Sequence, residues 1–448
     1  MAGFGWLSVV QVAEAIRSGQ VPAVEVMADQ LDRIARIDAD LHSVVTLDAD
    51  RARAGAVEAD EALAHGQVWG PLHGVGVTIE DIHATAGIRS TFGGFPPFAN
   101  HVPDVDATVV ARLKAAGAIV VGKTNGPCLW EDSVFPATRN PWNRERVAGG
   151  SSTGPAVAVA AGLTPLDIAA DSGGSIQQPA GFCGVFGMRP TEHRVPLTGT
   201  LFIDRIRKFR VLTTAGPMAR SIADLRLAME VISGPDGLDP EVPPVPWHHS
   251  GPAELNGLRV AYPPEYPAAV AGEVRASLDA LAGRLDKLGA IVEDRLPASA
   301  LARQGQLVEE LFMMLAFAAE SPAPETGEPG SRPLWDYLTV LNQRDELMAD
   351  WAEFFTTCDV LLAPATSVCA WPVNEDHSED DQQAQAEAAL LLSQASGCPM
   401  VVIPAGSDPN GVPIGAQLIG PRWHDEKLLA IAETITATTR GFQPPPAN

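Results

Sequence analysis

The segment from Gly149 to Thr191 holds the densest group of residues in this sequence that could do chemistry. Two Gly/Ser turns, residues 149–154 (GGSSTG) and 172–175 (SGGS), flank an Ala/Val-rich stretch that predicts a helix and a short strand ending near Ala170. Glycine lets the backbone turn sharply, and consecutive N–H groups at a helix start can bind developing negative charge. The pattern therefore predicts a site in which serine hydroxyls lie beside backbone donors.

A phosphate-binding turn is the alternative for the first of these segments. The sequence there lacks the G-x-x-x-x-G-K-[ST] arrangement, and no lysine follows the glycines. A single Gly/Ser turn is also commonly a plain loop, but two of them around one predicted helix favour a functional site.

The same segment resembles the signature of the amidase signature family, in which a Gly-Gly-Ser-Ser turn is followed, after a helix and a strand, by Asp-x-Gly-Gly-Ser. Further stretches resemble the family over nearly the whole chain: residues 71–81, 107–125, 138–143, 359–367 and 411–432. The resemblance implies one domain over residues 1–448, with its signature core at about 71–191 and variable substrate loops at about 300–345 and 370–390. It implies a single large α/β/α sandwich around a mixed, mostly parallel sheet.

The resemblance also implies catalytic roles. Ser175, the last residue of the second turn, corresponds to the nucleophile, and Ser151 corresponds to the serine that follows a cis peptide bond and relays the proton. The backbone N–H groups of Ser172, Gly173 and Gly174, together with that of Ser175, would form the oxyanion hole. Donors of this kind are worth about 10²–10³ in rate when they face a tetrahedral oxyanion.

Three further residues are expected to support this site: Asp171, Ser152 and Gln177. Asp171 directly precedes the second turn, and we interpret it as an acceptor that fixes the turn rather than as an acid or a base. Gln177 stands where the family usually has an arginine. Thr153 and Pro155 also depart from the family pattern, so the site carries several differences together.

The largest departure concerns the catalytic lysine of the family. That lysine lies in a stretch resembling G-x-P-V-x-V-K-D, whereas residues 74–81 read GVGVTIED and place Glu80 at its position. We expect Glu80 to act as the terminal base if burial raises its pKa from about 4.3 toward 6–7, because a carboxylate can accept a proton. The alternative is a buried carboxyl group, paired with a backbone or serine donor, in a protein that no longer hydrolyses amides.

Other titratable residues are given structural interpretations. Lys123 matches a lysine that is common in the family just after a strand, where its ordinary role is structural. His73 and His83 flank Glu80, but no Asp is paired with them in a recognisable motif and the sequence contains no Gly-x-Ser-x-Gly elbow. The acidic residues 375–381 are spaced unlike a calcium-binding loop and predict a solvated surface.

The elements that must position the site follow from apolar periodicity. A helix is predicted to begin after Ser8, which forms a capping box with Gln11, and a second helix carries an apolar stripe over residues 24–34. Residues 109–121 and 270–292 each read as a helix that ends at a glycine and continues into a β-branched strand. Such helix-to-strand steps predict an α/β fold.

Composition and charge exclude several classes of protein. The chain has 448 residues with 31 Lys and Arg against 55 Asp and Glu, a formal net charge of −24 that argues against a basic nucleic-acid or anionic-membrane binder. The five cysteines have no metal-ligand spacing, and no apolar run approaches the ~20 residues that span a bilayer. The N-terminus also lacks the order of a secretion signal. These features predict a cytoplasmic protein with reduced thiols.

Together, these observations predict an amidase-like hydrolase or acyl-transfer enzyme that cleaves a small-molecule amide through an acyl-enzyme on Ser175. The expected partner is that substrate, without a nucleic acid or a membrane, and we expect no cofactor and no metal; a homodimer would be common in the family. A second class of function stays open, in which a repurposed or inactive amidase fold serves as a binding or partner subunit. The two catalytic serines favour the enzyme, and the missing lysine favours the second class.

Overall fold

The computed structural model describes most of the chain. The described residues are 3–126, 133–200, 211–263, 266, 269–297, 304–311, 314, 334–373 and 394–446. The predicted substrate loops at 300–345 and 370–390 lie largely outside these ranges, as do the acidic residues 375–381.

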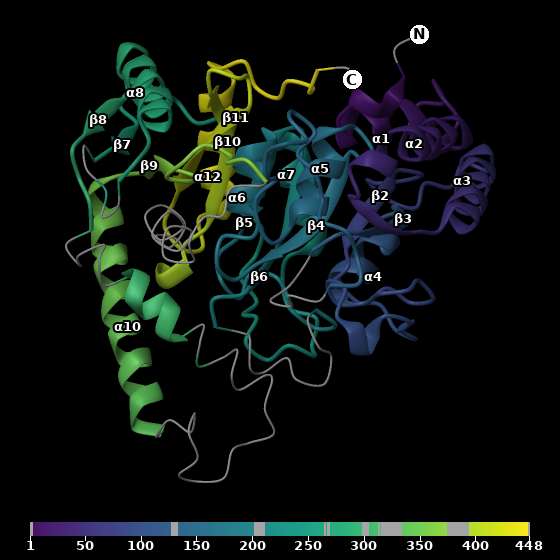
Figure 1. The fold of residues 1–448 in the computed structure, drawn as a ribbon, viewed down its shortest axis with the longest axis horizontal. Coiled ribbons are helices and arrows are strands. Elements are labelled where there is room, and N and C mark those ends of the chain that lie inside the picture. The colour runs from purple at the N-terminus through teal and green to yellow at the C-terminus, as the bar shows by residue number, and fades with distance from the viewer. Residues whose placement is uncertain are drawn as a thin grey trace.

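The strands of the described residues form one sheet of eleven, in the order β1-β3-β2-β4-β6-β5-β10-β11-β9-β7-β8 (Figure 1). Their bounds are β1 Val44–Leu47, β2 Gly76–Glu80, β3 Ile119–Thr124, β4 Leu166–Asp171, β5 Phe186–Arg189, β6 Thr214–Ala219, β7 Arg259–Ala261, β8 Ile291–Glu293, β9 Val360–Pro364, β10 Met400–Ser407 and β11 Pro413–Ile419. The predicted α/β class with a mixed sheet is confirmed.

The expectation that parallel pairs would dominate this sheet is wrong. Six of the ten described strand pairings are antiparallel, including β4 with β6 and β10 with β11. The local sequence shows only that a helix precedes a strand, whereas strand direction depends on partners that are distant in the chain. The helix-to-strand steps therefore predicted the strands but not the balance of their directions.

The helices of the described residues pack around this sheet. Their bounds are α1 Val9–Arg17, α2 Ala23–Ile37, α3 Ala49–Ala64, α4 Thr108–Ala115, α5 Thr153–Ala160, α6 Gln177–Cys183, α7 Ile222–Ile232, α8 Gly272–Lys287, α10 Leu334–Thr357 and α12 Asp425–Thr436. α5 and α6 pack against each other, α5 against β4 and α6 against β11, while α7 packs against α4, α12 and β6. The long helix α10 extends beyond the sheet at the lower left of Figure 1.

Local sequence signals explain where several helices begin. α1 has the predicted capping box: the Ser8 hydroxyl accepts from the Gln11 N–H, and the Gln11 side chain accepts from the Ser8 N–H. The predicted steps α4 to β3 and α8 to β8 are both present. Among the described residues, no helix is long and apolar enough to cross a membrane.

The parallel strands β3, β2 and β4 position the candidate site. Glu80 pairs with Thr124, and Thr78 pairs with Asp167, so the carboxyl ends of the three strands lie at the same edge of the sheet. All residues of β2, β4 and α5 are buried. The Ala- and Val-rich α5 can be enclosed on every side because its side chains are small and apolar. The two Gly/Ser turns adjoin this buried unit.

Candidate active site

The structure brings Ser151 and Ser175 together. Ser151 lies just before α5 and Ser175 just before α6, and the two hydroxyl oxygens are 2.9 Å apart in a hydrogen bond. The peptide bond between Gly150 and Ser151 is cis. Both serines are partly exposed, whereas the neighbouring Ser152 is buried. The pair is thus accessible from outside while its support lies within the core.

Gly149 allows the two Gly/Ser turns to approach each other closely. Gly149 has φ of +98°, and a Cβ at this position would lie 2.7 Å from the backbone nitrogen of Pro179 in α6. A side chain there would separate the two turns, because both the backbone conformation and the close approach favour glycine. Gly149 therefore contributes to the short distance between the two serines.

Asp171, at the end of β4, holds the second turn from within. Its Oδ1 accepts the Gly174 N–H at 3.0 Å, its Oδ2 accepts the Ile176 N–H at 2.7 Å, and Arg189 approaches Oδ1 to 3.5 Å. The Gly174 N–H donates to Asp171, so it is not among the proposed oxyanion donors. The Ser172 hydroxyl is hydrogen bonded to the Thr213 hydroxyl at 2.7 Å.

Glu80, the last residue of β2, lies behind the serines. It is 1% exposed, and its Oε2 accepts the Ala170 N–H at 2.8 Å. The Ser152 side chain is also a hydrogen-bond partner of Glu80, and its hydroxyl donates to the Ala170 carbonyl at 3.1 Å. Burial raises the pKa of Glu80 to about 8, with the nearby carboxylates of Asp167 and Asp81 acting in the same direction.

Glu80 and Ser151 are not hydrogen bonded to each other in the described part of the structure. Among the described residues, Glu80 is bonded to Ala170 and Ser152, and the Ser151 hydroxyl is bonded to Ser175. The Ser152 and Ala170 hydrogen bonds both lower the pKa of Glu80, but burial outweighs them and favours the neutral carboxyl group. This arrangement accommodates the protonated form of Glu80.

Lys123 does not occupy the place of a catalytic lysine. It pairs with Ile79, the residue before Glu80, and successive side chains of a strand point to opposite faces of the sheet. Its buried Nζ donates to the His83 carbonyl and to the Thr85 hydroxyl, the latter at 2.9 Å. Burial lowers the pKa of Lys123 to about 8.

Asp167 of β4 lies on the Glu80 side of the sheet. Its Oδ2 accepts the hydroxyl protons of Thr78 at 2.5 Å and of Thr124 at 2.9 Å. Burial raises its pKa to about 7. Glu80 and Asp167 are thus two buried carboxyl groups on the same side of the sheet, and burial favours the protonated form of each.

Both histidines near Glu80 are buried packing residues. The His73 ring contacts the Trp69 N–H and the Ala59 carbonyl. The His83 ring contacts the Thr200 hydroxyl at 2.8 Å, and burial lowers the pKa of His83 to about 3. These contacts place neither ring at the serine pair.

Sequence reasoning identified Gln177 but missed its two glutamine partners. The Gln177 side chain is hydrogen bonded to Gln394 and to Gln417, and Gln394 also donates to Asp171 at 3.3 Å. These partners lie more than 200 residues along the chain, where spacing gives no signal. Among the described residues, no group of three His, Cys, Asp or Glu side chains could hold a metal ion.

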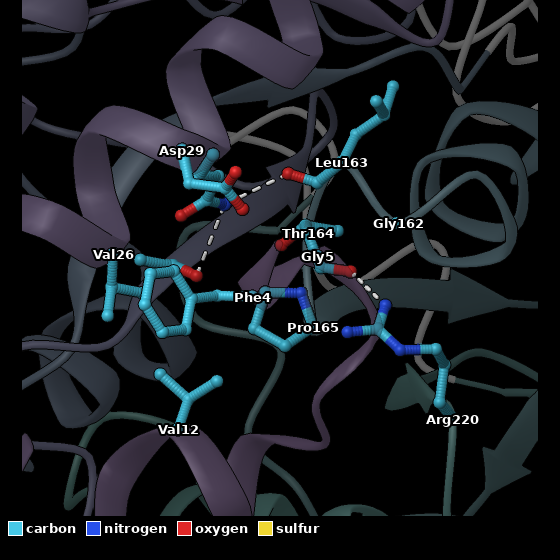
Figure 2. Close-up of a pocket in the computed structure, with 12 residues that line it drawn as sticks. Phe4, Gly5, Val12, Val26, Asp29, Gly162, Leu163, Thr164, Pro165 and Arg220 are labelled. Carbon is cyan, nitrogen blue, oxygen red and sulfur yellow. Dashed lines mark hydrogen bonds between the residues drawn. The ribbon is translucent and has the colours of Figure 1, made fainter. Parts of the chain in front are cut away.

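A cavity at the N-terminal end of the molecule is separate from this site. Figure 2 shows it between the start of the chain, α1, α2 and the turn before β4. Phe4, Val12, Val26, Leu163 and Arg220 are among its lining residues, which include neither of the paired serines. The cavity therefore does not contribute to the chemistry of the serine pair.

Comparison with known proteins identifies the family. The model of the family described as Amidase matches residues 25–321 and 329–429. The chain belongs to the amidase signature family. The A subunit of the glutamyl-tRNA(Gln) amidotransferase of Roseiflexus sp. (strain RS-1) is 34% identical, over 97% of this chain and 96% of the relative. This membership makes the protein an amide C–N hydrolase or amidotransferase.

Two solved structures share the amidase fold. A bacterial aryl acylamidase of the amidase signature enzymes has a TM-score of 0.84 at 25% identity, over 97% of this chain and 96% of the other. A vestigial protein complex, described as revealing the evolutionary origins of an s-triazine catabolic enzyme, contains a chain with a TM-score of 0.84 at 27% identity. That match covers 98% of this chain and 100% of the other.

The expected partners were wrong. A small-molecule amide, no nucleic acid and a homodimer were expected, whereas the relative from Roseiflexus is named as one subunit of an enzyme that acts on glutamyl-tRNA(Gln). The motifs that resemble the family carry no information on what else an amidase-family enzyme assembles with. A net charge of −24 concerns this one chain, so it does not exclude membership in a tRNA-dependent assembly.

Proposed function

We propose that this amidase-family enzyme cleaves a carboxamide C–N bond through an acyl-enzyme on Ser175, as the amide-cleaving subunit of an amidotransferase. The observation that carries the chemistry is the 2.9 Å hydrogen bond between the Ser151 and Ser175 hydroxyls at an accessible position. A nucleophile and its proton acceptor within hydrogen-bond reach are the usual requirement for covalent catalysis. The assembly is proposed from the relative of 34% identity.

In the first step, the Ser175 Oγ forms a bond to the carbonyl carbon of the amide while its proton passes to the Ser151 Oγ and the original Ser151 proton passes on to ionised Glu80. This step uses the hydrogen bond with Ser175 as the donor, which a rotation of the two hydroxyl groups allows. The N–H groups of Ser172, Gly173 and Ser175 are the proposed donors to the oxyanion. The C–N bond then breaks as the nitrogen takes a proton from Ser151, which regains one from Glu80, and water or an acceptor amine later cleaves the acyl-enzyme.

Glu80 is proposed to take the place of the family lysine as the terminal base. Because burial raises its pKa to about 8, Glu80 is mostly neutral at pH 7 and accepts a proton only as the pH rises past that value. Its carboxyl group contacts Ser152 rather than Ser151, so the proton transfer requires the Glu80 or the Ser151 side chain to rotate until the two are within hydrogen-bond reach. We therefore expect activity to increase with pH through about 8.

A second candidate is a partner subunit that no longer cleaves amides. The observation in its favour is the satisfied, neutral Glu80, bonded to Ala170 and Ser152 rather than to Ser151. Such a subunit would keep the fold and its contacts with other subunits without an activated serine. The two candidates differ in whether Ser175 reacts as a nucleophile.

Labelling with a fluorophosphonate, followed by intact-protein and peptide mass spectrometry from pH 5 to 10, tests the chemistry. We expect wild-type labelling at Ser175 at a rate that rises through about pH 8, and no labelling of Ser175→Ala. Ser18→Ala is the matched control, because it removes an exposed serine hydroxyl that donates only to carbonyls of α1. Labelling of Glu80→Lys alone, with an unreactive wild type, would favour the partner subunit.

The amidotransferase assignment is tested by exchanging subunits. This chain would replace the A subunit in the Roseiflexus enzyme, and the amidation of glutamyl-tRNA(Gln) would be followed. We expect amidated tRNA with the wild-type chain and none with Ser175→Ala. Failure of the wild type, beside an active enzyme with its own A subunit, would reject the assembly while leaving the labelling result to decide the chemistry.

A further inference from the structure

Three glutamine side chains form a hydrogen-bonded row beside residues 172–175, the turn that carries Ser175 and is called the nucleophile turn below. Gln177 begins α6, Gln417 lies in β11, and Gln394 begins the last described range of the chain. All three are fully buried. The Gln394 Nε2 donates to the Gln177 Oε1, the Gln177 Nε2 donates to the Gln417 Oε1 at 2.6 Å, and the Gln417 Nε2 donates to the Pro364 carbonyl at 2.9 Å.

The groups at the two ends determine how all three amides are oriented. The Pro364 carbonyl only accepts, so Gln417 must present its nitrogen there and its oxygen to Gln177. Gln177 then presents its nitrogen to Gln417 and its oxygen to Gln394. At the other end, Gln394 presents its nitrogen both to that oxygen and to the Asp171 carboxylate, at 3.3 Å for the latter. Each hydrogen bond in the row joins an amide N–H to an oxygen. Flipping one amide would bring two donors or two acceptors together.

An amide at position 177 supplies both the donor and the acceptor that this row uses. An arginine, which the family usually has there, offers donors alone and would leave the Gln394 nitrogen facing another donor. A carboxylate would offer acceptors alone and would face the Gln417 oxygen. The glutamine at 177 therefore matches the two glutamines around it, and the row is a feature of this chain's own residues.

The row ends at the carboxylate that holds the nucleophile turn. Asp171 accepts the N–H groups of Gly174 and Ile176, the residues on either side of Ser175. Gln394 is a neutral donor to the same Oδ1 that accepts from Gly174. A shift of this amide therefore moves the acceptor on which the turn depends.

We infer that Gln394 is a positioning residue for Ser175: it orients Asp171 through the glutamine row and thereby fixes the turn that carries the nucleophile and the oxyanion donors. The inference rests on the proposed function of Ser175. Gln394 acts through Asp171 and does not itself contact the reacting atoms. The same row joins the nucleophile turn to β9 and β11, so the turn is tied to the far half of the sheet.

The test compares Gln394→Leu with wild type in two measurements. We expect the rate of fluorophosphonate labelling of the folded protein to fall about tenfold, the value of one lost hydrogen bond of about 1.4 kcal/mol. We also expect faster hydrogen exchange of the Gly174 and Ile176 N–H groups. Gln443→Leu is the matched control, because Gln443 is exposed and its amide donates only to nearby carbonyls.

The two measurements separate this inference from the proposed function. An unreactive wild type with faster exchange in Gln394→Leu would reject the nucleophile and retain the control of the turn by Gln394. Unchanged labelling together with unchanged exchange would overturn the inference.

Gln394→Glu provides a test that does not depend on the leucine variant folding. A protonated carboxyl group keeps one donor for Gln177 or Asp171, whereas the ionised form has none. We therefore expect the labelling rate of this variant, divided by that of wild type, to fall as the pH rises. A ratio that is independent of pH would mean that position 394 only fills space, which would overturn the inference.

Discussion

At the scale of single residues, the protonation of Glu80 decides between the two proposed functions. The side chain occupies a fully buried position with the Ala170 N–H and the Ser152 hydroxyl as partners. A Cβ on Gly126 would clash with the Glu80 carboxyl group, so glycine at 126 leaves the space that this carboxyl group fills. The pocket thus fits a neutral carboxyl group, and ionisation has to work against burial.

Replacing Glu80 by glutamine should change how stability depends on pH. An amide mimics the protonated acid, since its oxygen can accept from Ala170 and its nitrogen can donate to Ser152. In wild type, Glu80 ionises near pH 4.3 when unfolded and near 8 when folded, so its contribution to stability falls by at most about 1.4 kcal/mol per pH unit between these values. In urea unfolding, the free energy of unfolding of Glu80→Gln should rise relative to that of wild type as the pH increases from 5 to 8.

The comparison of these two proteins removes the contributions of other groups, such as Asp167 and Lys123, because both proteins contain them. Glu353→Gln is the control at an exposed position and should show no such trend. A constant difference between Glu80→Gln and wild type across pH 5 to 8 would mean that Glu80 is ionised throughout. The inference that Glu80 is neutral in the folded protein would then be wrong.

At the scale of elements, the sequence predicted what depends on neighbouring residues. The capping box of α1 and the steps α4 to β3 and α8 to β8 were right, because capping residues and apolar periodicity act within a few residues of the chain. Val24 was expected on the buried stripe of α2 but is 38% exposed, while Gln30 is buried there. Periodicity predicted the helix, whereas its rotation depends on packing against α3 and on the hydrogen bonds of Gln30 to the Gly76 and Leu163 carbonyls.

The parts that sequence could not predict are contacts between distant segments. The strand directions and the glutamine row both join residues that are far apart in the chain. For Glu80, the motif fixed the position, but its hydrogen-bond partners Ala170 and Ser152 depend on how β4 and α5 pack against β2. The two serines were predicted together only because the motif resembles the amidase signature.

The turn between β4 and α6 carries Ser175, the proposed nucleophile, and Asp171→Asn tests the rigidity of this turn. An asparagine offers one acceptor oxygen for the two N–H groups of Gly174 and Ile176, and it removes the negative charge beside the buried Arg189. We expect a loss of about 2–4 kcal/mol in the free energy of unfolding and labelling of Ser175 that is at least about tenfold slower.

Asp408→Asn is the matched control for this change. Asp408 also holds a turn, between β10 and β11, but it accepts the N–H groups of Asn410 and Val412 on the single oxygen Oδ1, so an asparagine can keep both bonds. This variant removes a turn carboxylate outside the site and should leave the labelling of the folded protein unchanged. Equal labelling rates for Asp171→Asn and wild type would show that the turn does not need this carboxylate for reactivity.

At the scale of the whole molecule, a buried ion-pair network joins α10 to the signature segment. Arg344 of α10 contacts Glu192 through both guanidinium nitrogens, at 3.1 Å and 2.5 Å, and its Nε donates to the Ala395 carbonyl. Arg189 lies 3.9 Å from Glu192 and 3.5 Å from Asp171. The helix that extends from the body in Figure 1 is therefore linked through charged side chains to the nucleophile turn.

Glu192→Gln should weaken this connection strongly. Burial alone would raise the pKa of Glu192, but Arg344 and Arg189 hold it at about 2, so its stabilising effect is present above about pH 4.3 and lost as pH falls through about 2. The variant leaves two buried guanidinium groups without this carboxylate. We expect the free energy of unfolding at pH 7 to fall by about 3–5 kcal/mol.

Thermal and urea unfolding at pH 7 and near pH 3 measure this loss, and hydrogen exchange across residues 334–357 shows whether α10 loosens with it. Glu433→Gln is the matched control, because its pair with Arg226 is partly exposed and should be worth no more than about 1 kcal/mol. The loss for Glu192→Gln should shrink toward acid pH as the wild-type carboxylate takes up its proton. If both variants lost the same small amount, α10 would be held by apolar packing, and its charged link to the nucleophile turn would carry no energy.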